Sequence, residues 1–223
     1  MSAYCDNRGS FGKLSRAQEA IVRRFVTGRA VHDLGAGDFF LSRCLIDLGA
    51  RRVFAVERQA RHSGILEAGS PYEAVQVVGA GFRALGKVAR HHRRVQDPLP
   101  AAWTPDVAFV SWPTPEDSKF TSHSDYSLLA FVRRAKVVIY LGSNLDGTMC
   151  GSRKLYEHLG RREVLAHEPD RRNTLIVYGR LLPRGRGREL LPEERAGIDT
   201  TQIYRFRDVY PTVTADDVLG RTS

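Results

Sequence analysis

The sequence is poor in the features that mark secreted, membrane-spanning or zinc-binding proteins. Its 223 residues include three cysteines, at positions 5, 44 and 150, which are too few and too far apart for a disulfide framework or a zinc site. The longest apolar runs, such as 137–141, fall far short of the roughly 20 residues that span a bilayer. The first residues carry no basic segment that leads into an apolar stretch, so we expect no signal peptide. These absences predict a soluble, cytoplasmic protein with no membrane partner and no metal site.

The composition is that of a folded protein with an excess of positive charge. Hydrophobic residues make up 42% and charged residues 26% of the chain, which excludes a mostly disordered protein. Lysine and arginine number 34 against 25 acidic residues, a formal net charge of +9, and 29 of the 34 are arginine. Two explanations fit this excess: a polyanionic partner, or the arginine enrichment that a GC-rich genome produces over a whole surface.

Apolar strand-like runs alternate with amphipathic stretches, which predicts an α/β protein with a layered sheet. Strands are expected at 30–34, 53–56, 74–78, 106–110, 136–141, 163–167 and 174–178. Helices are expected at 14–25 with Ser15 as N-cap, at 38–48, and near 58–68, 82–94, 122–134 and 151–159. This spacing predicts one domain over residues 1–180, with the first helix covering the sheet. Residues 181–223 are expected to form a C-terminal extension, in which 183–188 is a linker or a mobile arm.

The clearest unit runs from residue 29 to residue 57. A short buried strand at 30–34 leads into the glycine turn 35–37, after which Asp38 is expected to open an amphipathic helix that ends at Gly49. The next strand ends in Glu57, where a carboxylate can accept hydrogen bonds from both hydroxyls of a ribose. Strand, glycine turn, helix, strand and acid in this order are typical of a nucleotide-binding half-fold.

Two cofactor classes use this layout. A dinucleotide needs a small residue three positions after the second glycine, but that position holds Phe40, and Asp38 would repel a pyrophosphate. NAD is therefore disfavoured. The string 31–38 (VHDLGAGD) instead resembles the first motif of class I S-adenosylmethionine-dependent methyltransferases. An unrelated α/β protein with a glycine turn and no cofactor is the alternative.

The resemblance covers residues 29 to about 180 and implies a seven-stranded, mostly parallel, doubly wound sheet with helices on both faces. It implies that Asp33 orients the methionine ammonium group of the cofactor and that Glu57 holds its ribose. The cofactor-binding residues implied in this way are Asp33, Gly35, Ala36, Gly37, Asp38, Glu57, Arg58, Phe82 and Ser111. The chain departs from the family after the third strand, where Gly79-Ala80-Gly81-Phe82 replaces the usual acidic residue. Either Phe82 stacks on the adenine, or the third strand lies elsewhere.

The methyl acceptor is expected at the loops that follow the fourth and fifth strands. The string Ser111-Trp112-Pro113-Thr114-Pro115 is a distorted likeness of the motif by which amino-methylating nucleic-acid methyltransferases hold a target base. Ser111 and Trp112 are therefore candidate catalytic residues, and the alternative is a rigid proline-rich turn. His123 is the best-placed proton acceptor among the seven histidines, although a loop histidine is more often only solvated. The loop 142–151 is a further candidate, or a turn built for backbone tolerance.

One predicted helix carries a row of cations that fits a phosphate backbone or, equally, a solvated outer face. Its members recur at helical spacing and are Arg83, Lys87, Arg90 and Arg94. The leading hypothesis is therefore an S-adenosylmethionine-dependent methyltransferase with a nucleic-acid acceptor, and a small-molecule or protein acceptor stays open. The second hypothesis is a non-catalytic nucleic-acid-binding protein with a methyltransferase-like fold.

Overall fold

The structure is a computed structural model that describes residues 14–36, 39–57, 75–79, 105–113, 125–143, 151–170 and 173–199. The two helices predicted near 58–68 and 82–94 lie outside these residues, as do the cations Arg83, Lys87, Arg90 and Arg94.

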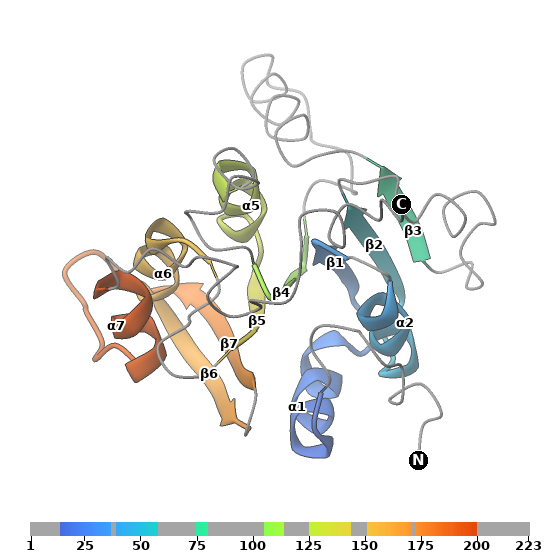
Figure 1. Ribbon diagram of the computed structural model, residues 1–223, viewed down its shortest axis with the longest axis horizontal. Helices are drawn as coiled ribbons and strands as arrows, with labels where there is room; N and C mark the ends of the chain where they lie inside the picture. The colour runs from blue at the N-terminus through green and yellow to red at the C-terminus, as the bar shows by residue number, and fades with distance from the viewer. Residues whose placement is uncertain are drawn as a thin grey trace, which may run out of the picture.

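The centre of the molecule is a mixed seven-stranded sheet (Figure 1). Its strands are β1 Ala30–Leu34, β2 Arg52–Glu57, β3 Val75–Gly79, β4 Val107–Ser111, β5 Val137–Ser143, β6 Arg162–Pro169 and β7 Asn173–Leu181. Their order is β3-β2-β1-β4-β5-β7-β6. The first five are parallel and have the order of a Rossmann sheet, whereas an antiparallel β6–β7 hairpin takes the place of a sixth parallel strand. The strand order reverses between β1 and β4, and ligands of such sheets bind at the carboxyl ends of the strands at this switch point.

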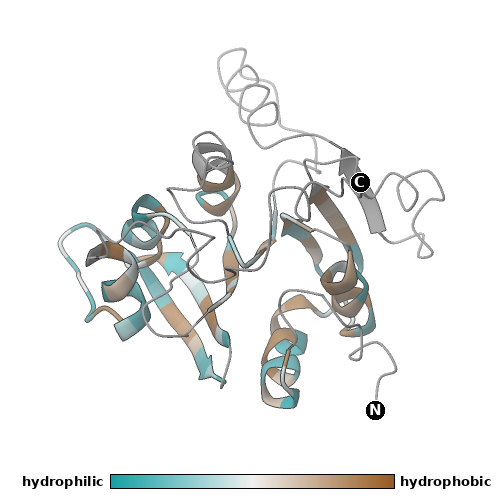
Figure 2. Cartoon of the chain, viewed as in Figure 1, coloured by the Kyte–Doolittle hydropathy of each residue, from teal (hydrophilic) through white to brown (hydrophobic). Residues whose placement is uncertain are grey.

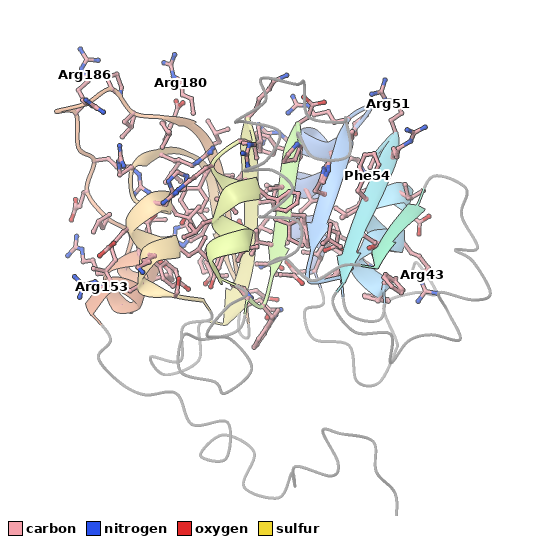
Figure 3. All side chains as sticks on the ribbon, turned by 90° about the horizontal axis from the view of Figure 1, so that it is seen from above. Arg43, Arg51, Phe54, Arg153, Arg180 and Arg186 are labelled. Atoms are coloured by element: carbon pink, nitrogen blue, oxygen red, sulfur yellow. The ribbon has the colours of Figure 1, made fainter. Side chains whose placement is uncertain are left out.

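Helices cover both faces of the sheet. They are α1 Arg16–Val26, α2 Phe40–Asp47, α5 Asp125–Val132, α6 Arg153–Leu159 and α7 Pro192–Asp199. Helices α1 and α2 pack on one face, and α5, α6 and α7 contribute to the core on the other. The strands are hydrophobic in the centre of the molecule, while polar residues collect on the outer surfaces of the helices (Figure 2). Figure 3 shows the strands side by side with both of their ends in view. No helix among the described residues is long and apolar enough to cross a membrane.

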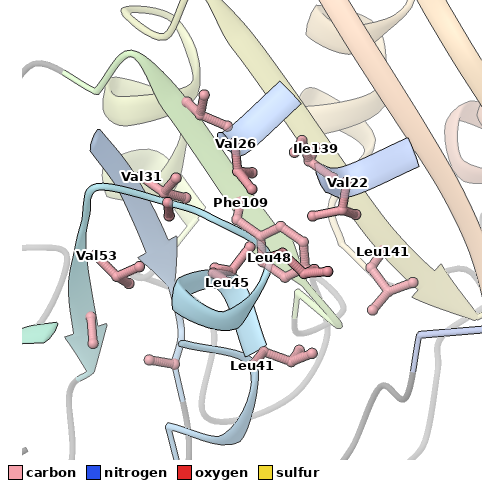
Figure 4. Packing of buried hydrophobic residues seen from close by; sticks show 14 of the residues in the cluster. Val22, Val26, Val31, Leu41, Leu45, Leu48, Val53, Phe109, Ile139 and Leu141 are labelled. Carbon is pink, nitrogen blue, oxygen red and sulfur yellow. The ribbon is translucent and has the colours of Figure 1, made fainter. Parts of the chain in front are cut away.

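Side-chain alternation along the strands produces the two cores. The α1–α2 side is shown in Figure 4, where the labelled side chains are Val22, Val26, Val31, Leu41, Leu45, Leu48, Val53, Phe109, Ile139 and Leu141. Their neighbours along the strands point to the opposite face, where Val110, Val138 and Ile176 meet α5 and α6. Continuous burial on both faces explains why the central strands are apolar at almost every position.

Helix α1 begins as the sequence predicts. The Ser15 hydroxyl accepts from the Gln18 backbone N–H, and the Gln18 side chain accepts from the Ser15 N–H, which completes a capping box. The Gln18 amide also donates to the carbonyl of Glu168 at 3.1 Å, so α1 is tied to the end of the β6–β7 hairpin.

The prediction that Asp38 opens helix α2 is wrong. The helix begins at Phe40, and its N-cap is Phe39, which adopts a left-handed conformation with φ 62° and makes no side-chain capping bond. Both phenylalanine rings are buried, so the burial of two large side chains outweighs the usual preference for a polar cap. The predicted end is confirmed, because Gly49 follows the helix with φ +98°.

Helix α7 was not predicted. Its N-terminal turn is fixed by Glu194, whose carboxylate accepts from the Leu191 N–H at 2.8 Å and from both terminal nitrogens of Arg188. Arg188 also donates to the carbonyls of Leu159 and Arg162, at the end of α6 and the start of β6. Residue 188, expected in a linker or mobile arm, is therefore held against the sheet domain.

Candidate cofactor and acceptor site

The glycine turn after β1 lies at the switch point of the sheet. Gly35 has φ +83°, a conformation that strains any residue with a side chain, and its N–H donates to the Val56 carbonyl at 2.9 Å. The Ala36 N–H donates to the same carbonyl at 3.2 Å, so the turn is fixed against the end of β2. Apart from Gly35 itself and its two chain neighbours, no described residue has a heavy atom within 4 Å of the position that a Cβ on Gly35 would occupy. The exposed backbone of Gly35 therefore offers a surface that a ligand can approach closely.

Asp33 lies directly beneath this turn and is fully buried. Its Oδ2 accepts from the hydroxyl of Ser42 in α2 at 2.6 Å, and the Ser42 side chain is also fully buried. A short hydrogen bond to a carboxylate in a dry environment is strong, so the pair fixes the relative position of β1 and α2. Sequence reasoning missed Ser42, although a serine on the apolar face of α2 was the available signal. The implied contact of Asp33 with an ammonium group stays a prediction.

Glu57 is the last residue of β2 and follows the residue that holds the turn. It pairs with Gly79, the last residue of β3, so the described backbone places its position at the carboxyl edge beside the turn. The sequence analysis left open that the third strand lies elsewhere than at 74–78. Strand β3 lies within one residue of that position, so this alternative is removed. Of the other implied cofactor-binding residues, Gly37, Asp38, Arg58 and Phe82 lie outside the described residues.

The turn after β4 closes the other side of the switch point. Leu34 pairs with Val110, so the next residue of β4, Ser111, lies beside Gly35 at the carboxyl edge. Ser111 and Trp112 are half-buried, and the Trp112 N–H donates to the carbonyl of Leu141 at 2.8 Å. Trp112 has φ 44°, and a left-handed conformation costs a non-glycine residue about 1–2 kcal/mol. Strain of this kind is concentrated at functional sites.

The beginning of α6 packs against the same turn. Gly151 has φ +107°, and a Cβ added there would lie 3.2 Å from Cγ of Pro113. The next residue, Ser152, is buried and caps α6 by accepting from the Leu155 N–H at 3.2 Å. The segments that follow β4 and β5 are thus in direct contact, as the sequence analysis expected of two loops on one edge. His123 and residues 144–150 lie outside the described residues.

Comparison with known proteins identifies this arrangement. A candidate RNA methyltransferase from Pyrococcus horikoshii superposes with a TM-score of 0.51 and 16% identity, over 81% of this chain and 96% of its own. The ribosomal protein L11 methylase of Lactobacillus delbrueckii superposes with a TM-score of 0.50 and 16% identity, over 77% of this chain and 81% of its own. The chain has the fold of the class I S-adenosylmethionine-dependent methyltransferases. No protein-family model and no curated protein sequence matches it.

The methyltransferase fold accounts for the position of the site but does not identify an acceptor. At 16% identity the two likenesses establish the fold alone. Within the described residues, no group of three histidine, cysteine, aspartate or glutamate side chains could hold a metal ion.

Proposed function

We propose that the protein is an S-adenosylmethionine-dependent methyltransferase and that nucleic acid is its first-choice acceptor. The observation that carries the proposal is the open, left-handed Gly35 turn at the switch point, between the end of β2 at Glu57 and the end of β4 at Ser111. In sheets of this kind a cofactor lies across that crevice.

The residues at the turn fit S-adenosylmethionine better than a dinucleotide. The third small residue that a dinucleotide fingerprint requires is replaced by Phe40, whose ring is buried at the first position of α2. Glu57 is the residue for the two ribose hydroxyls, and the backbone at Gly35 and Ala36 is the surface along which the cofactor would lie. Bound S-adenosylmethionine supplies an electrophilic methyl carbon on its sulfonium group.

The acceptor would be held by the turn after β4. Ser111 offers a hydroxyl that can accept a hydrogen bond from a target amine, and Trp112 offers an aromatic surface for stacking. His123 remains the predicted proton acceptor. The net charge of +9 favours nucleic acid as acceptor, and a protein or small-molecule acceptor stays a second choice.

The test is a calorimetric titration with S-adenosylmethionine, S-adenosylhomocysteine and NAD. We expect the first two to bind and NAD not to bind, and we expect Glu57→Ala to weaken binding of S-adenosylmethionine at least tenfold. The matched control is Glu163→Ala, which removes an acid from the opposite end of the sheet, where Glu163 pairs with Arg180 at 3.7 Å. Equal affinities of Glu57→Ala and the wild type would refute the ribose assignment, and binding of NAD alone would refute the cofactor class.

One observation favours a second candidate, a nucleic-acid-binding protein that has the fold without the chemistry. The structure ends β3 at Gly79, so the position where the family carries its acidic residue falls in a glycine-rich segment. Incubation with methyl-labelled cofactor and total RNA, DNA or protein separates the two candidates. Transfer of label to any acceptor excludes the non-catalytic candidate.

A further inference from the structure

The end of the sheet opposite the candidate site carries a row of exposed cations. At this end β1, β2, β4 and β5 begin, and the antiparallel β7 ends. Figure 3 shows Arg51, Arg180 and Arg186 projecting from this end, whereas Arg43 and Arg153 lie at the other. We call this row the basic edge. Its exposed members are Arg29, Arg51, Arg52, Arg133, Lys136, Arg161, Arg180, Arg184 and Arg186.

Few acidic side chains offset this charge. The exposed or half-buried acids in the same chain segments are Asp47, Asp106, Glu163 and Glu189, against nine exposed cations. Asp106 lies 2.9 Å from Lys136, Glu163 lies 3.7 Å from Arg180, and Glu189 pairs with Arg195 of α7. The basic edge therefore keeps a large excess of positive charge.

Members of the basic edge lie side by side in two groups, at β2–β1 and at β5–β7–β6, and the Asp106–Lys136 ion pair stands between them at β4 and β5. At one end the Arg51 N–H donates to the carbonyl of Arg29 at 2.9 Å, and at the other the Leu182 N–H donates to the carbonyl of Arg161 at 2.9 Å. The buried Arg162 donates to the carbonyl of Val132, the last residue of α5. Arg133 and Arg161 are the chain neighbours of these two residues, so they lie close together.

The positive charge of the edge also acts on His158, which is buried in α6 next to it. The pKa of His158 is lowered to about 4 by its burial and, after that, by the positive charges of Arg162, Arg133 and Arg161. Two of these arginines, 133 and 161, are exposed members of the basic edge.

We propose that the basic edge binds the phosphate backbone of a nucleic acid, at a surface separate from the candidate methyl-transfer site. The edge runs from β2 to β6 across six strands, which at about 4.8 Å spacing give it a length of roughly 24 Å and match roughly seven phosphates of one strand of a duplex. The interaction does not depend on methyl transfer, because none of its residues lies at the carboxyl edge of the sheet.

The chemistry of the edge favours nucleic acid over an anionic membrane. Eight of the nine cations are arginine, whose planar guanidinium binds phosphate through two parallel hydrogen bonds. A membrane-binding surface combines such charge with large apolar side chains that enter the lipid. Among the described residues, the exposed large hydrophobic side chains are Leu165 and Leu181, and only Leu181 lies at this end of the sheet.

The test measures fluorescence anisotropy of labelled 20-nucleotide RNA and 20-base-pair DNA over a range of salt concentrations. The edge variant is Arg51→Gln with Arg184→Gln, and the charge-matched control is Arg16→Gln with Arg153→Gln, which removes two exposed arginines from the first turns of α1 and α6. We expect the edge variant to lose at least tenfold in affinity near 0.1 M salt and to flatten the log–log salt slope by about 1.5, because each lost phosphate contact removes about 0.7–0.9. The control is expected to stay within twofold of the wild type. Circular dichroism spectra of both variants, compared with that of the wild type, are to check that the variants fold.

Three results would overturn the proposal. The first is an unchanged affinity of the edge variant, which would locate nucleic-acid binding elsewhere, because both variants keep the cations of residues 83–94. The second is an equal loss of affinity in the edge variant and the control, which would show that binding depends on the net charge of the protein and not on the position of the arginines. The third is binding to vesicles of phosphatidylserine without binding to either oligonucleotide, which would make the partner a membrane.

Discussion

Arg162 is a buried residue whose removal is expected to cost a large part of the stability of the fold. Its side chain is 2% exposed, yet it carries a positive charge into the core. The guanidinium donates to the carbonyls of Gly179 at 2.6 Å, Val132 at 2.7 Å and Ala135 at 3.0 Å, and to Nε2 of His158 at 3.3 Å. One side chain thus joins the end of α5, the end of β7 and helix α6, and it places a cation at the carboxyl end of the α5 dipole.

The change Arg162→Met keeps an unbranched apolar stem, shorter than that of arginine, and removes every donor. Three buried carbonyl groups then lose a charged partner, at about 1–3 kcal/mol each. Part of this loss is offset because a buried charge with no carboxylate partner no longer has to be desolvated. We therefore expect a net loss of about 3–5 kcal/mol, a large fraction of the 5–15 kcal/mol typical of a folded domain.

Urea unfolding followed by circular dichroism measures this loss. The matched control is Arg180→Met, because Arg180 lies next to Gly179 in β7 but is exposed and makes only a 3.7 Å ion pair. Such a pair contributes about 0–1 kcal/mol. If Arg162→Met lies within about 1 kcal/mol of Arg180→Met in free energy of unfolding, the hydrogen bonds of Arg162 do not stabilise the fold and the reasoning is refuted.

Three further changes test other contacts in the same way. The pKa of His158 is about 4 in the folded protein and 6.5 in the unfolded chain, so the unfolded chain binds the proton first as the pH drops. The free energy of unfolding is therefore expected to fall by roughly 3 kcal/mol between pH 6.5 and pH 4. His158→Gln accepts a hydrogen bond without titrating and should remove this part of the pH dependence, measured as the midpoint of urea unfolding at each pH. Ser42→Ala removes the 2.6 Å donor to the buried Asp33 carboxylate and should cost about 1–3 kcal/mol in thermal unfolding, whereas no loss would show that this hydrogen bond does not stabilise the fold. Glu194→Gln leaves the Arg188 guanidinium without its buried carboxylate and should cost about 3–5 kcal/mol, with protease cleavage near α7 as a second readout; unchanged cleavage would contradict the role of this pair.

The sequence was sufficient for elements whose pattern is local. All seven strands lie within a few residues of their predicted positions, because each is an apolar run between turn residues. Helix α1 was predicted from Ser15, whose capping bond spans only three residues. Helix α7 was missed because a non-local contact fixes it: Gly197 packs directly against the ring of Tyr156, 41 positions earlier in the chain. Sequence periodicity contains no signal for such a contact.

The same distinction divides the candidate site. Gly35 was predicted correctly as a turn residue, since its left-handed conformation is a property of the local chain. The Ser42 contact with Asp33 spans nine residues and two elements, so it follows only once α2 is packed on β1. The left-handed Trp112 was also beyond the sequence, because an aromatic residue adopts that conformation only when the surrounding structure enforces it.

The parallel arrangement of β1, β2, β4 and β5 gives the two ends of the sheet different chemistry. One end gathers the glycine turn, Glu57 and Ser111, and the other gathers the basic edge. The strands between the two ends are five to seven residues long, so the ends lie roughly 16–23 Å apart. A nucleic acid held on the basic edge can reach Ser111 only by passing around the sheet, which a short oligonucleotide is unable to do. If nucleic acid is the acceptor, Arg51→Gln with Arg184→Gln should therefore slow methylation of long substrates while leaving that of short ones unchanged. An equal loss on both lengths would show that the two ends of the sheet act as one surface.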